Sequence, residues 1–262
     1  MESGIFDSHA HYDDRRFDDD RTELLDGLFR SGKLFAAVNC GCDIASSESS
    51  LRLAEAYEGV YAAVGIHPHE AEDATEDDYL RLEELCSHKK AVAIGEIGLD
   101  YHYDFSPREK QKEAFIRQME LAERLGMPVV IHDREAHKDC VDIATSFKGV
   151  TGVLHSFSGS AETAKILQKA GWYISFSGVV TFKNAKQAAL AVEAVANDRL
   201  LVETDCPYLT PHPHRGERNH SGYVEHIIAK IAEIRSESYE FIETLTRENA
   251  KRFFGIERAA TR

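Results

Sequence analysis

The sequence predicts an α/β fold, a (β/α)8 TIM barrel that occupies residues 1–262 as a single domain. Short β-rich runs alternate with longer amphipathic stretches along the whole chain. Such alternation predicts a parallel sheet whose strands are joined by right-handed helical crossovers. The length of 262 residues suits one barrel of roughly 250 residues, and a hydrophobic fraction of 43% can fill its core.

Eight segments have the composition of strands, and each is followed by a stretch with helical character. Two of them, 91–95 and 128–131, are continuous apolar runs, as expected for parallel strands that are buried on both faces. Eight repeats favour a closed barrel, whereas six or fewer would favour an open doubly wound sheet, which is the alternative fold. The predicted strands are 5–8, 34–39, 60–65, 91–95, 128–131, 152–154, 172–176 and 200–203.

The clearest helical signals lie in 106–125. Ser106 is suited to cap this helix, Pro107 fits its first position, and Gly126 ends it just before the next predicted strand. The last predicted helix is expected to close the barrel or to cover its bottom. Further helices are expected at 184–195, 223–234 and 238–254.

The chain is acidic, and this limits how it can hold nucleic acid. Its net charge is -14, from 31 Lys and Arg residues against 45 Asp and Glu residues. An acidic protein has no long-range attraction for a phosphate backbone. The charge therefore argues against a stable nucleic-acid binder. An enzyme of this composition would have to grip one chain end through metal ions and a few arginines.

The cysteines and the start of the chain favour the cytoplasm. The five cysteines are odd in number and include no CxxC pair, so neither a disulfide framework nor a thiolate zinc site is predicted. The N-terminus does not resemble a signal peptide, and no apolar run approaches ~18–20 residues, so we expect no membrane span. We therefore expect a cytoplasmic protein with reduced cysteines.

Six side chains that commonly bind metals fall at the C-terminal ends of predicted strands. In a barrel these ends converge on one mouth, where such folds keep their active sites. Each residue alone has an ordinary structural explanation, such as a core histidine or a paired carboxylate. Six of them together would be a costly cluster of polar groups unless something bound them. The six predicted metal ligands are His9, His11, Glu96, His132, His155 and Asp205.

Six ligands are too many for one tetrahedral ion that keeps an open position, so we expect two ions. Glu96 is the natural bridge because it is central in strand order. Two close ions can bind a water between them, lower its pKa and clamp the attacking and leaving oxygens. Glu96 and Asp205 are predicted to be catalytic, with Asp205 accepting a proton from that water. We expect His9, His11 and Asp205 on one ion, and His132 and His155 on the other.

Five motifs that contain these residues strongly resemble, in the same order, the TatD family of metal-dependent deoxyribonucleases. The resemblance covers nearly the whole chain, and it implies a TIM barrel of the amidohydrolase superfamily. It also implies Mg2+-supported cleavage of DNA from its ends, of the 3′–5′ exonuclease type. Four histidines, by contrast, suit Zn, Mn, Co or Ni better than Mg. The motifs are FDSHAH at 6–11, GEIGLDY at 95–101, PVVIHDR at 128–134, HSFSG at 155–159 and ETDCPYL at 203–209.

Two loops also match the family, and two positions depart from it. GIHPH at 65–69 and PHPHRG at 211–216 resemble the loops after strands three and eight. The family usually has Asn-Glu-Pro where this chain has Asn-His-Ser at 219–221. The acidic residue expected soon after Ala136 is displaced by two intervening residues. Because neither departure touches a predicted metal ligand, they affect the expected substrate more than the chemistry.

Several further residues are predicted to act around the metals. His67, Arg134, Arg215 and Asn219 are the expected substrate contacts, of which Arg215 is the better phosphate clamp. His67 has an alternative structural role in a Pro-flanked loop. Arg134 has the alternative of pairing with a barrel carboxylate. Glu203 is placed to accept a hydrogen bond from a ligand histidine and so to orient it.

Two enzymatic functions are consistent with these residues. The first is phosphodiester hydrolysis at DNA ends, with single-stranded ends as the expected substrate, and the resemblance favours it. The second is hydrolysis of a small ester, amide or lactone, and the acidic surface favours it. A metal-binding protein without catalysis fits less well, because the centre keeps an open position and a candidate base. The aromatic side chains of 101–103 are expected either to stack on bases or to pack over the mouth.

Overall fold

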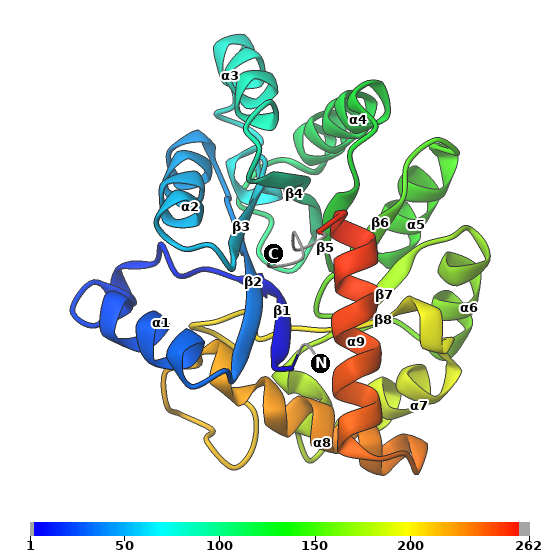
Figure 1. The fold of residues 1–262 in the computed structure, drawn as a ribbon. Coiled ribbons are helices and arrows are strands. Elements are labelled where there is room, and N and C mark those ends of the chain that lie inside the picture. Colours follow the sequence, from blue (N-terminus) through cyan, green and yellow to red (C-terminus); the bar gives the residue numbers. More distant parts are fainter. Residues whose placement is uncertain (1–2, 257–262) are drawn as a thin grey trace.

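In the computed structural model, residues 3–256 form one eight-stranded sheet wrapped in helices (Figure 1). The strands follow one another in sequence order, and each pairs with the next in parallel. The chain after the last strand returns to the first, where Cys206 forms a parallel bridge with Ala10. This confirms the predicted (β/α)8 barrel. Positions 1–2 and 257–262 of the predicted domain lie outside the described residues.

β1, β2, β4 and β5 run further than their sequences predict, and the extension is longest in β4 and β5. β4 continues to Asp100 and pairs with β5 up to Arg134, so Glu96 and His132 lie within strands rather than after them. Gly98 makes this possible: its φ is +139°, and a Cβ atom there would lie 2.0 Å from the carbonyl oxygen of His132. The strands are β1 Ile5–Ala10, β2 Leu34–Cys40, β3 Val60–Val64, β4 Ala91–Asp100, β5 Val129–Arg134, β6 Gly152–Leu154, β7 Tyr173–Phe176 and β8 Leu200–Val202.

The predicted helices are present, with one correction at a helix start. α4 begins at Arg108, so Pro107 is the residue before the helix rather than its first residue, and α4 ends before Gly126 as predicted. Gly126 adopts a left-handed conformation. Ser106 does not cap α4; its hydroxyl instead donates to the carbonyl of His69 at 2.8 Å. The helices are α1 Arg21–Arg30, α2 Ile44–Ala56, α3 Glu76–Cys86, α4 Arg108–Leu125, α5 His137–Ser146, α6 Ala161–Lys169, α7 Lys186–Ala194, α8 Val224–Arg235 and α9 Tyr239–Phe254.

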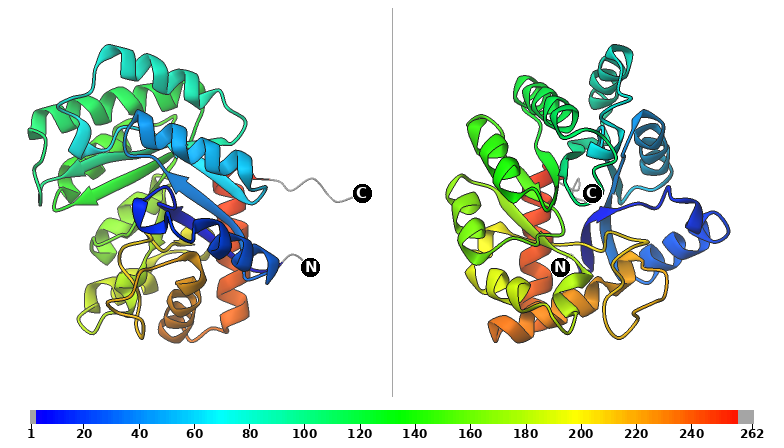
Figure 2. Two further views of the ribbon diagram at one scale, coloured as in Figure 1. Left: turned by 90° about the vertical axis from the view of Figure 1, so that its left-hand side faces the viewer. Right: turned by 180° about the vertical axis from the view of Figure 1, so that it is seen from behind.

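The last helix, α9, covers one end of the barrel. Its Phe253 and Phe254 belong to the apolar cluster that fills the barrel interior, and Phe254 stacks on Phe6 at the start of β1. The side view in Figure 2 shows α9 at one end of the molecule. Because α9 lies at the N-terminal ends of the strands, the opposite mouth is left to the predicted site. Among the described residues, no helix is long and apolar enough to span a membrane.

Candidate metal centre

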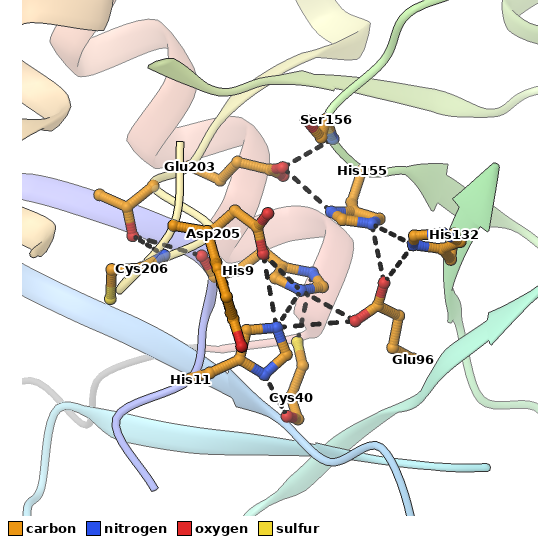
Figure 3. Close-up of polar contacts among 12 residues, drawn as sticks. His9, His11, Cys40, Glu96, His132, His155, Ser156, Glu203, Asp205 and Cys206 are labelled. Carbon is orange, nitrogen blue, oxygen red and sulfur yellow. Dashed lines mark hydrogen bonds and ion pairs between the residues drawn. The ribbon is translucent and has the colours of Figure 1, made fainter. Parts of the chain in front are cut away.

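The barrel brings all six predicted ligands together at the C-terminal ends of its strands (Figure 3). His9, Glu96 and His132 lie within β1, β4 and β5, and the other three lie in the segments that follow β1, β6 and β8. The contact between Asp205 and the first strand depends on barrel closure, because the backbone N–H of Asp205 donates to the carbonyl of His9 at 2.9 Å. Residues nearly 200 positions apart in the chain therefore share one site.

Glu96 lies at the middle of the cluster, with one carboxylate oxygen on each side. Its Oε1 is 2.7 Å from Nδ1 of His132 and 2.8 Å from Nε2 of His155. Its Oε2 is 3.3 Å from Nε2 of His9 and 3.6 Å from Nε2 of His11. One carboxylate thus serves two separate pairs of histidines, and it is almost fully buried.

Asp205 completes the half of the cluster that contains His9 and His11. Its Oδ1 lies 3.4 Å from Nε2 of His11 and 3.7 Å from Nε2 of His9. The two Nε2 atoms are themselves 3.0 Å apart. Four atoms, counting Oε2 of Glu96, therefore need no more than a small movement to surround a common point, as the ligands of one ion would.

The outer nitrogens of two histidines fix which nitrogen faces the cluster. Nδ1 of His11 donates to the carbonyl of Cys40 at 2.9 Å, and Nδ1 of His155 donates to Oε1 of Glu203 at 3.2 Å. Because Nδ1 carries a proton in each ring, a bound metal ion would displace only the proton on Nε2, and Nε2 would then present its lone pair to that ion. Metal-binding histidines are usually oriented in this way by a carbonyl or carboxylate on the far side of the ring.

The arrangement of these atoms fits divalent cations. Histidine nitrogens and carboxylate oxygens converge on the same small volume, and there are fewer N–H groups than oxygen and nitrogen acceptors. Burying so many acceptors together is unfavourable unless positive charge lies between them. Glu203 also has a buried oxygen, Oε2, with no hydrogen-bond partner in the described part of the chain. Among residues 3–256, three sets of side chains have ligand atoms close enough to hold an ion, namely His9, His155 and Glu203; His9, His11 and Glu96; and His67, Glu96 and His132.

The electrostatics of the cluster keep Glu96 ionised. Burial opposes its ionisation, but the neighbouring His155, His9 and His67 hold the pKa of Glu96 well below its usual range. His155 responds in the opposite direction. Burial lowers its pKa, whereas Glu96 and Glu203 together raise it well above the usual value. The centre therefore carries concentrated negative charge that histidine protons or metal ions must balance.

Sequence reasoning missed Asp100, the last residue of β4. This fully buried carboxylate accepts hydrogen bonds through Oδ2 from Nε2 of His132 at 3.2 Å and from Nε2 of His69 at 2.8 Å. Burial opposes its ionisation, but His132 and the backbone N–H of Tyr103 lower the pKa of Asp100 below its usual range. Its place at a C-terminal strand end, within the motif at 95–101, was the signal in the sequence.

His67 reaches the centre from the loop after β3 and differs from the other histidines. Its Nδ1 accepts a hydrogen bond from the backbone N–H of His69 at 3.2 Å, while its Nε2 lies 3.6 Å from Oε1 of Glu96. Burial lowers the pKa of His67 to about 4, so the ring is neutral near pH 7. Because Nδ1 accepts, the single proton must lie on Nε2, and the ring points an N–H group into the site.

The two arginines predicted to contact phosphate lie on aromatic rings instead of carboxylates. Arg134 lies 4.6 Å from the centre of the Tyr103 ring. Arg215 lies 4.0 Å from that of Phe182 and donates to the carbonyl of Thr210 at 2.9 Å. Within residues 3–256 neither guanidinium pairs with a carboxylate, so the alternative of an ion pair for Arg134 is not what the structure contains. Both side chains are exposed and keep their charge available.

Asn219, predicted to contact substrate, is fully buried. Its side-chain amide donates to the carbonyls of Thr204 at 3.0 Å and Tyr208 at 2.6 Å. These two carbonyls lie on either side of Asp205 in the chain. In the structure Asn219 therefore holds the loop that carries Asp205, and its side chain is not presented to the mouth.

A buried carboxylate, Asp7, supports the same loop from β1. Its oxygens accept hydrogen bonds from the hydroxyl groups of Thr204 at 2.6 Å and Ser221 at 2.7 Å. Burial raises the pKa of Asp7 to about 6. Ser221 is one of the residues at which this sequence departs from the family pattern. The departure thus lies in the support of the Asp205 loop and not among the metal-facing side chains.

Comparison with known proteins gives a consistent result. The family model described as TatD related DNase matches residues 6–255. The metal-dependent hydrolase YabD of Bacillus subtilis is 44% identical over 254 residues, which are 96% of this chain and 99% of that protein. A protein of Cronobacter sakazakii named 3'-5' ssDNA/RNA exonuclease TatD is 32% identical over 257 residues, covering 95% of this chain and 97% of its own length.

A solved structure supports the same comparison. YJJV, a TatD homolog from Escherichia coli K12, superimposes with a TM-score of 0.90 at 26% sequence identity. The match covers 98% of this chain and all of that one, 100%. Both the strand order and the helices around it are therefore shared along the whole length.

Proposed function

Because this chain belongs to the TatD-related DNase family of metal-dependent hydrolases that act on ester bonds, we propose that it is a two-metal 3′–5′ exonuclease that removes nucleotides from single-stranded DNA ends. The observation that carries the proposal is the position of Glu96. Its two oxygens face two separate groups of histidines. A carboxylate shared in this way is the expected bridge of a centre with two close ions.

The chain offers a distinct ligand set for each ion. His9, His11 and Asp205 would hold one together with Oε2 of Glu96, and His132 and His155 would hold the other together with Oε1. Two divalent ions bound there would stabilise the negative charge on the phosphoryl oxygens and lower the pKa of an attacking water. Glu203 and Asp100 would orient His155 and His132 through the ring nitrogens that face outward.

Asp205 is the proposed base. Its Oδ1 faces His9 and His11, which leaves Oδ2 to accept a proton from the attacking water. The water oxygen would form a new bond to phosphorus as the bond from phosphorus to the 3′ oxygen of the preceding nucleotide breaks. That 3′ oxygen would take up the proton that Asp205 accepted, and the terminal nucleotide would leave with a 5′ phosphate. Asp205 has a left-handed backbone conformation, with φ of +57°. The side-chain amide of Asn219 fixes the adjoining backbone by donating to the carbonyl of Thr204.

Charge on the phosphate would be balanced by groups of the chain that are not ligands. The N–H group at Nε2 of neutral His67 is placed to donate to a phosphoryl oxygen. Arg134 and Arg215 would contact further phosphates, because neither is neutralised by a carboxylate among residues 3–256. With a net charge of -14, the protein depends on these local groups rather than on a broad basic groove.

The names of two relatives support a nucleic-acid substrate, whereas the acidic net charge of this chain supports a small neutral substrate as the alternative. Proteins of Cronobacter sakazakii and Musicola paradisiaca that this chain resembles are named 3'-5' ssDNA/RNA exonucleases. The acidic composition would suit a small ester, amide or lactone equally well, since such a substrate needs no grip on a polyanion. RNA ends would be held by the same phosphate contacts as DNA ends.

The test is a time course on end-labelled DNA at several salt concentrations. Single-stranded, duplex and closed circular substrates are compared, beside a panel of nitrophenyl esters. We expect stepwise products from single-stranded ends and little from circles. Two or three phosphate contacts predict a shallow log–log dependence on salt, with a slope of about -0.7 per contact.

Three outcomes would contradict the proposal. Efficient cutting of closed circles would show that no free end is needed. A salt dependence as steep as that of roughly six to ten contacts would show a broad basic groove. Turnover of nitrophenyl esters without release of nucleotides would favour hydrolysis of a small ester, amide or lactone. Whichever activity is found, Glu96→Gln is expected to abolish it.

A further inference from the structure

An exposed pair of aromatic rings lies at the lip of the barrel mouth, in the loop between β4 and α4. Tyr103 and Phe105 stack on each other with ring centres 5.2 Å apart and an angle of 20°. Phe105 is 65% exposed and Tyr103 is 47% exposed. Burying a phenylalanine side chain normally stabilises a protein. The fold itself therefore gives no reason to leave Phe105 in solvent.

The loop that carries these rings is fixed at both ends. The backbone N–H groups of His102 and Tyr103 both donate to Oδ1 of Asp100 at 2.9 Å. At the other end the hydroxyl of Ser106, which does not cap α4, donates to the carbonyl of His69 at 2.8 Å. The exposed rings are thus presented by an ordered loop, which lowers the entropic cost of binding a flat ligand.

The same rings are connected to the metal centre by direct contacts. The ring of Phe105 lies 4.7 Å from that of His69. His69 donates to Asp100, which also accepts from the predicted metal ligand His132. A ligand on Phe105 would therefore lie beside the half of the centre that contains His132 and His155.

Positive charge accompanies the rings. The guanidinium of Arg134 lies over Tyr103 at 4.6 Å from the ring centre, and among residues 3–256 it has no carboxylate partner. An aromatic face next to an unpaired guanidinium is the usual combination for an unpaired base and its phosphate. Across the centre, beside His11, a second exposed ring, Tyr208, lies under Arg16 at 4.1 Å. Rings on both sides suit a strand that crosses the mouth better than a small ester.

We propose that Phe105 and Tyr103 form a stacking site for an unpaired nucleobase of the substrate strand, next to the nucleotide that is cleaved. The inference rests on the proposed nuclease function and adds a base contact to its phosphate contacts. Stacking has no sequence requirement, because every base has a flat face. The rings would therefore favour single-stranded ends over duplex ends, because the bases of a duplex are already paired and stacked and are not free to contact the rings.

The test compares Phe105→Ala with wild type on two single-stranded substrates. One is an ordinary oligonucleotide, and the other is the same strand with abasic residues at its last three positions. On the ordinary strand, loss of one stacked base is expected to lower kcat/KM roughly 5- to 100-fold. On the abasic strand the variant and the wild type should be equal. The matched control is Phe241→Ala, which removes a ring that is 40% exposed on α9 at the other end of the barrel.

Two results would overturn the stacking site. Equal kcat/KM of Phe105→Ala and wild type on the ordinary strand would remove it outright. An equal loss on both strands would mean that Phe105 has only a structural role. The oligomeric state of both proteins in solution tests whether a second copy of this chain covers the rings instead. If wild type is a dimer, Phe105→Ala is a monomer and cleavage is unchanged, the rings form a contact between two copies, and the stacking site is wrong.

A binding measurement separates this inference from the proposed function. The fluorescence of 2-aminopurine in a single-stranded oligonucleotide falls when the base stacks on an aromatic ring. It is measured with Asp205→Asn, with and without Phe105→Ala. If the quenching is lost with Phe105→Ala but wild type cleaves no nucleic acid, the proposed nuclease function is wrong and the stacking site remains. Absence of quenching in both proteins would reject the stacking site.

Discussion

The carboxylate of Glu203 accepts a hydrogen bond from Nδ1 of His155 over 3.2 Å, on the side of the ring away from Glu96. This contact leaves the lone pair of Nε2 for a metal ion. We expect Glu203→Gln to weaken metal affinity about 10- to 100-fold, as measured by titration against a competing chelator. Glu217→Gln is the matched control, since Glu217 binds Nδ1 of His214 at 3.1 Å on the surface. Unchanged affinity in Glu203→Gln would contradict this role.

Asp205→Asn is expected to keep the fold and lose most activity. The amide preserves the size of the side chain and one oxygen, but it cannot accept the proton of the attacking water. A positioned base typically contributes about 10² to 10⁴ in rate, so kcat should fall at least 100-fold, with little change in Tm. Turnover near the wild-type rate would show that another group is the base.

His67 provides a test of hydrogen-bond donor against metal ligand. His67→Gln keeps an N–H group near the position of Nε2, whereas His67→Leu removes it. We expect both variants to retain the metal content of the wild type, and the leucine variant to lose more kcat on oligonucleotides than the glutamine variant. Loss of a bound ion in His67→Leu would instead place His67 among the ligands, as its position beside Glu96 and His132 allows.

Metal content tests the expected preference of the centre. Protein purified without added metal should carry Zn, Mn, Co or Ni, because imidazole ligands favour these ions over Mg. One ion is expected to remain after gel filtration and the other to exchange with Mg2+ in solution. Elemental analysis measures the first, and recovery of activity after chelation and addition of each ion measures the second. Absence of any transition metal after purification would refute the expected preference.

The pH dependence of stability should contain a contribution from His220. Burial, with Lys33 and Arg218 nearby, lowers the pKa of His220 to about 4 from its ordinary 6.5. Between these values the unfolded chain binds a proton that the folded chain does not. The contribution is therefore complete above pH 6.5 and is lost as the pH falls toward 4. When the pH falls from 7 to 4, denaturant unfolding should show that wild type loses more stability than His220→Gln.

His137 is the control of opposite sign for this measurement. Its hydrogen bond to Asp133, at 2.7 Å, raises the pKa of His137 above its ordinary value. It therefore stabilises the fold below pH 6.5 and loses that contribution as the pH rises through its folded pKa. The difference between wild type and His137→Gln should shrink with rising pH. The same trend in both variants would show that other groups dominate the profile.

Much of the centre was predictable because strand ends are visible in the sequence. A histidine pair two residues apart after an apolar run predicts two side chains on one face, and His9 and His11 do lie together. The position of Glu96 between two pairs of histidines followed from its place in the middle of the strand order. The extension of β4 to Asp100 was not predictable from composition, because it depends on how closely Gly98 lets the backbone of β5 approach.

The sequence by itself determined the fold class, the family and the set of side chains at the barrel mouth, since the alternation of strands and helices and the order of motifs are properties of the chain. The tertiary structure alone decided what those side chains do for one another. It places a backbone N–H group on Nδ1 of His67, the carboxylate of Asp100 on Nε2 of His132, and the hydroxyl of Ser106 on the carbonyl of His69 rather than at the start of α4. Such partners come from other strands and loops, so only the folded barrel brings them within hydrogen-bond distance.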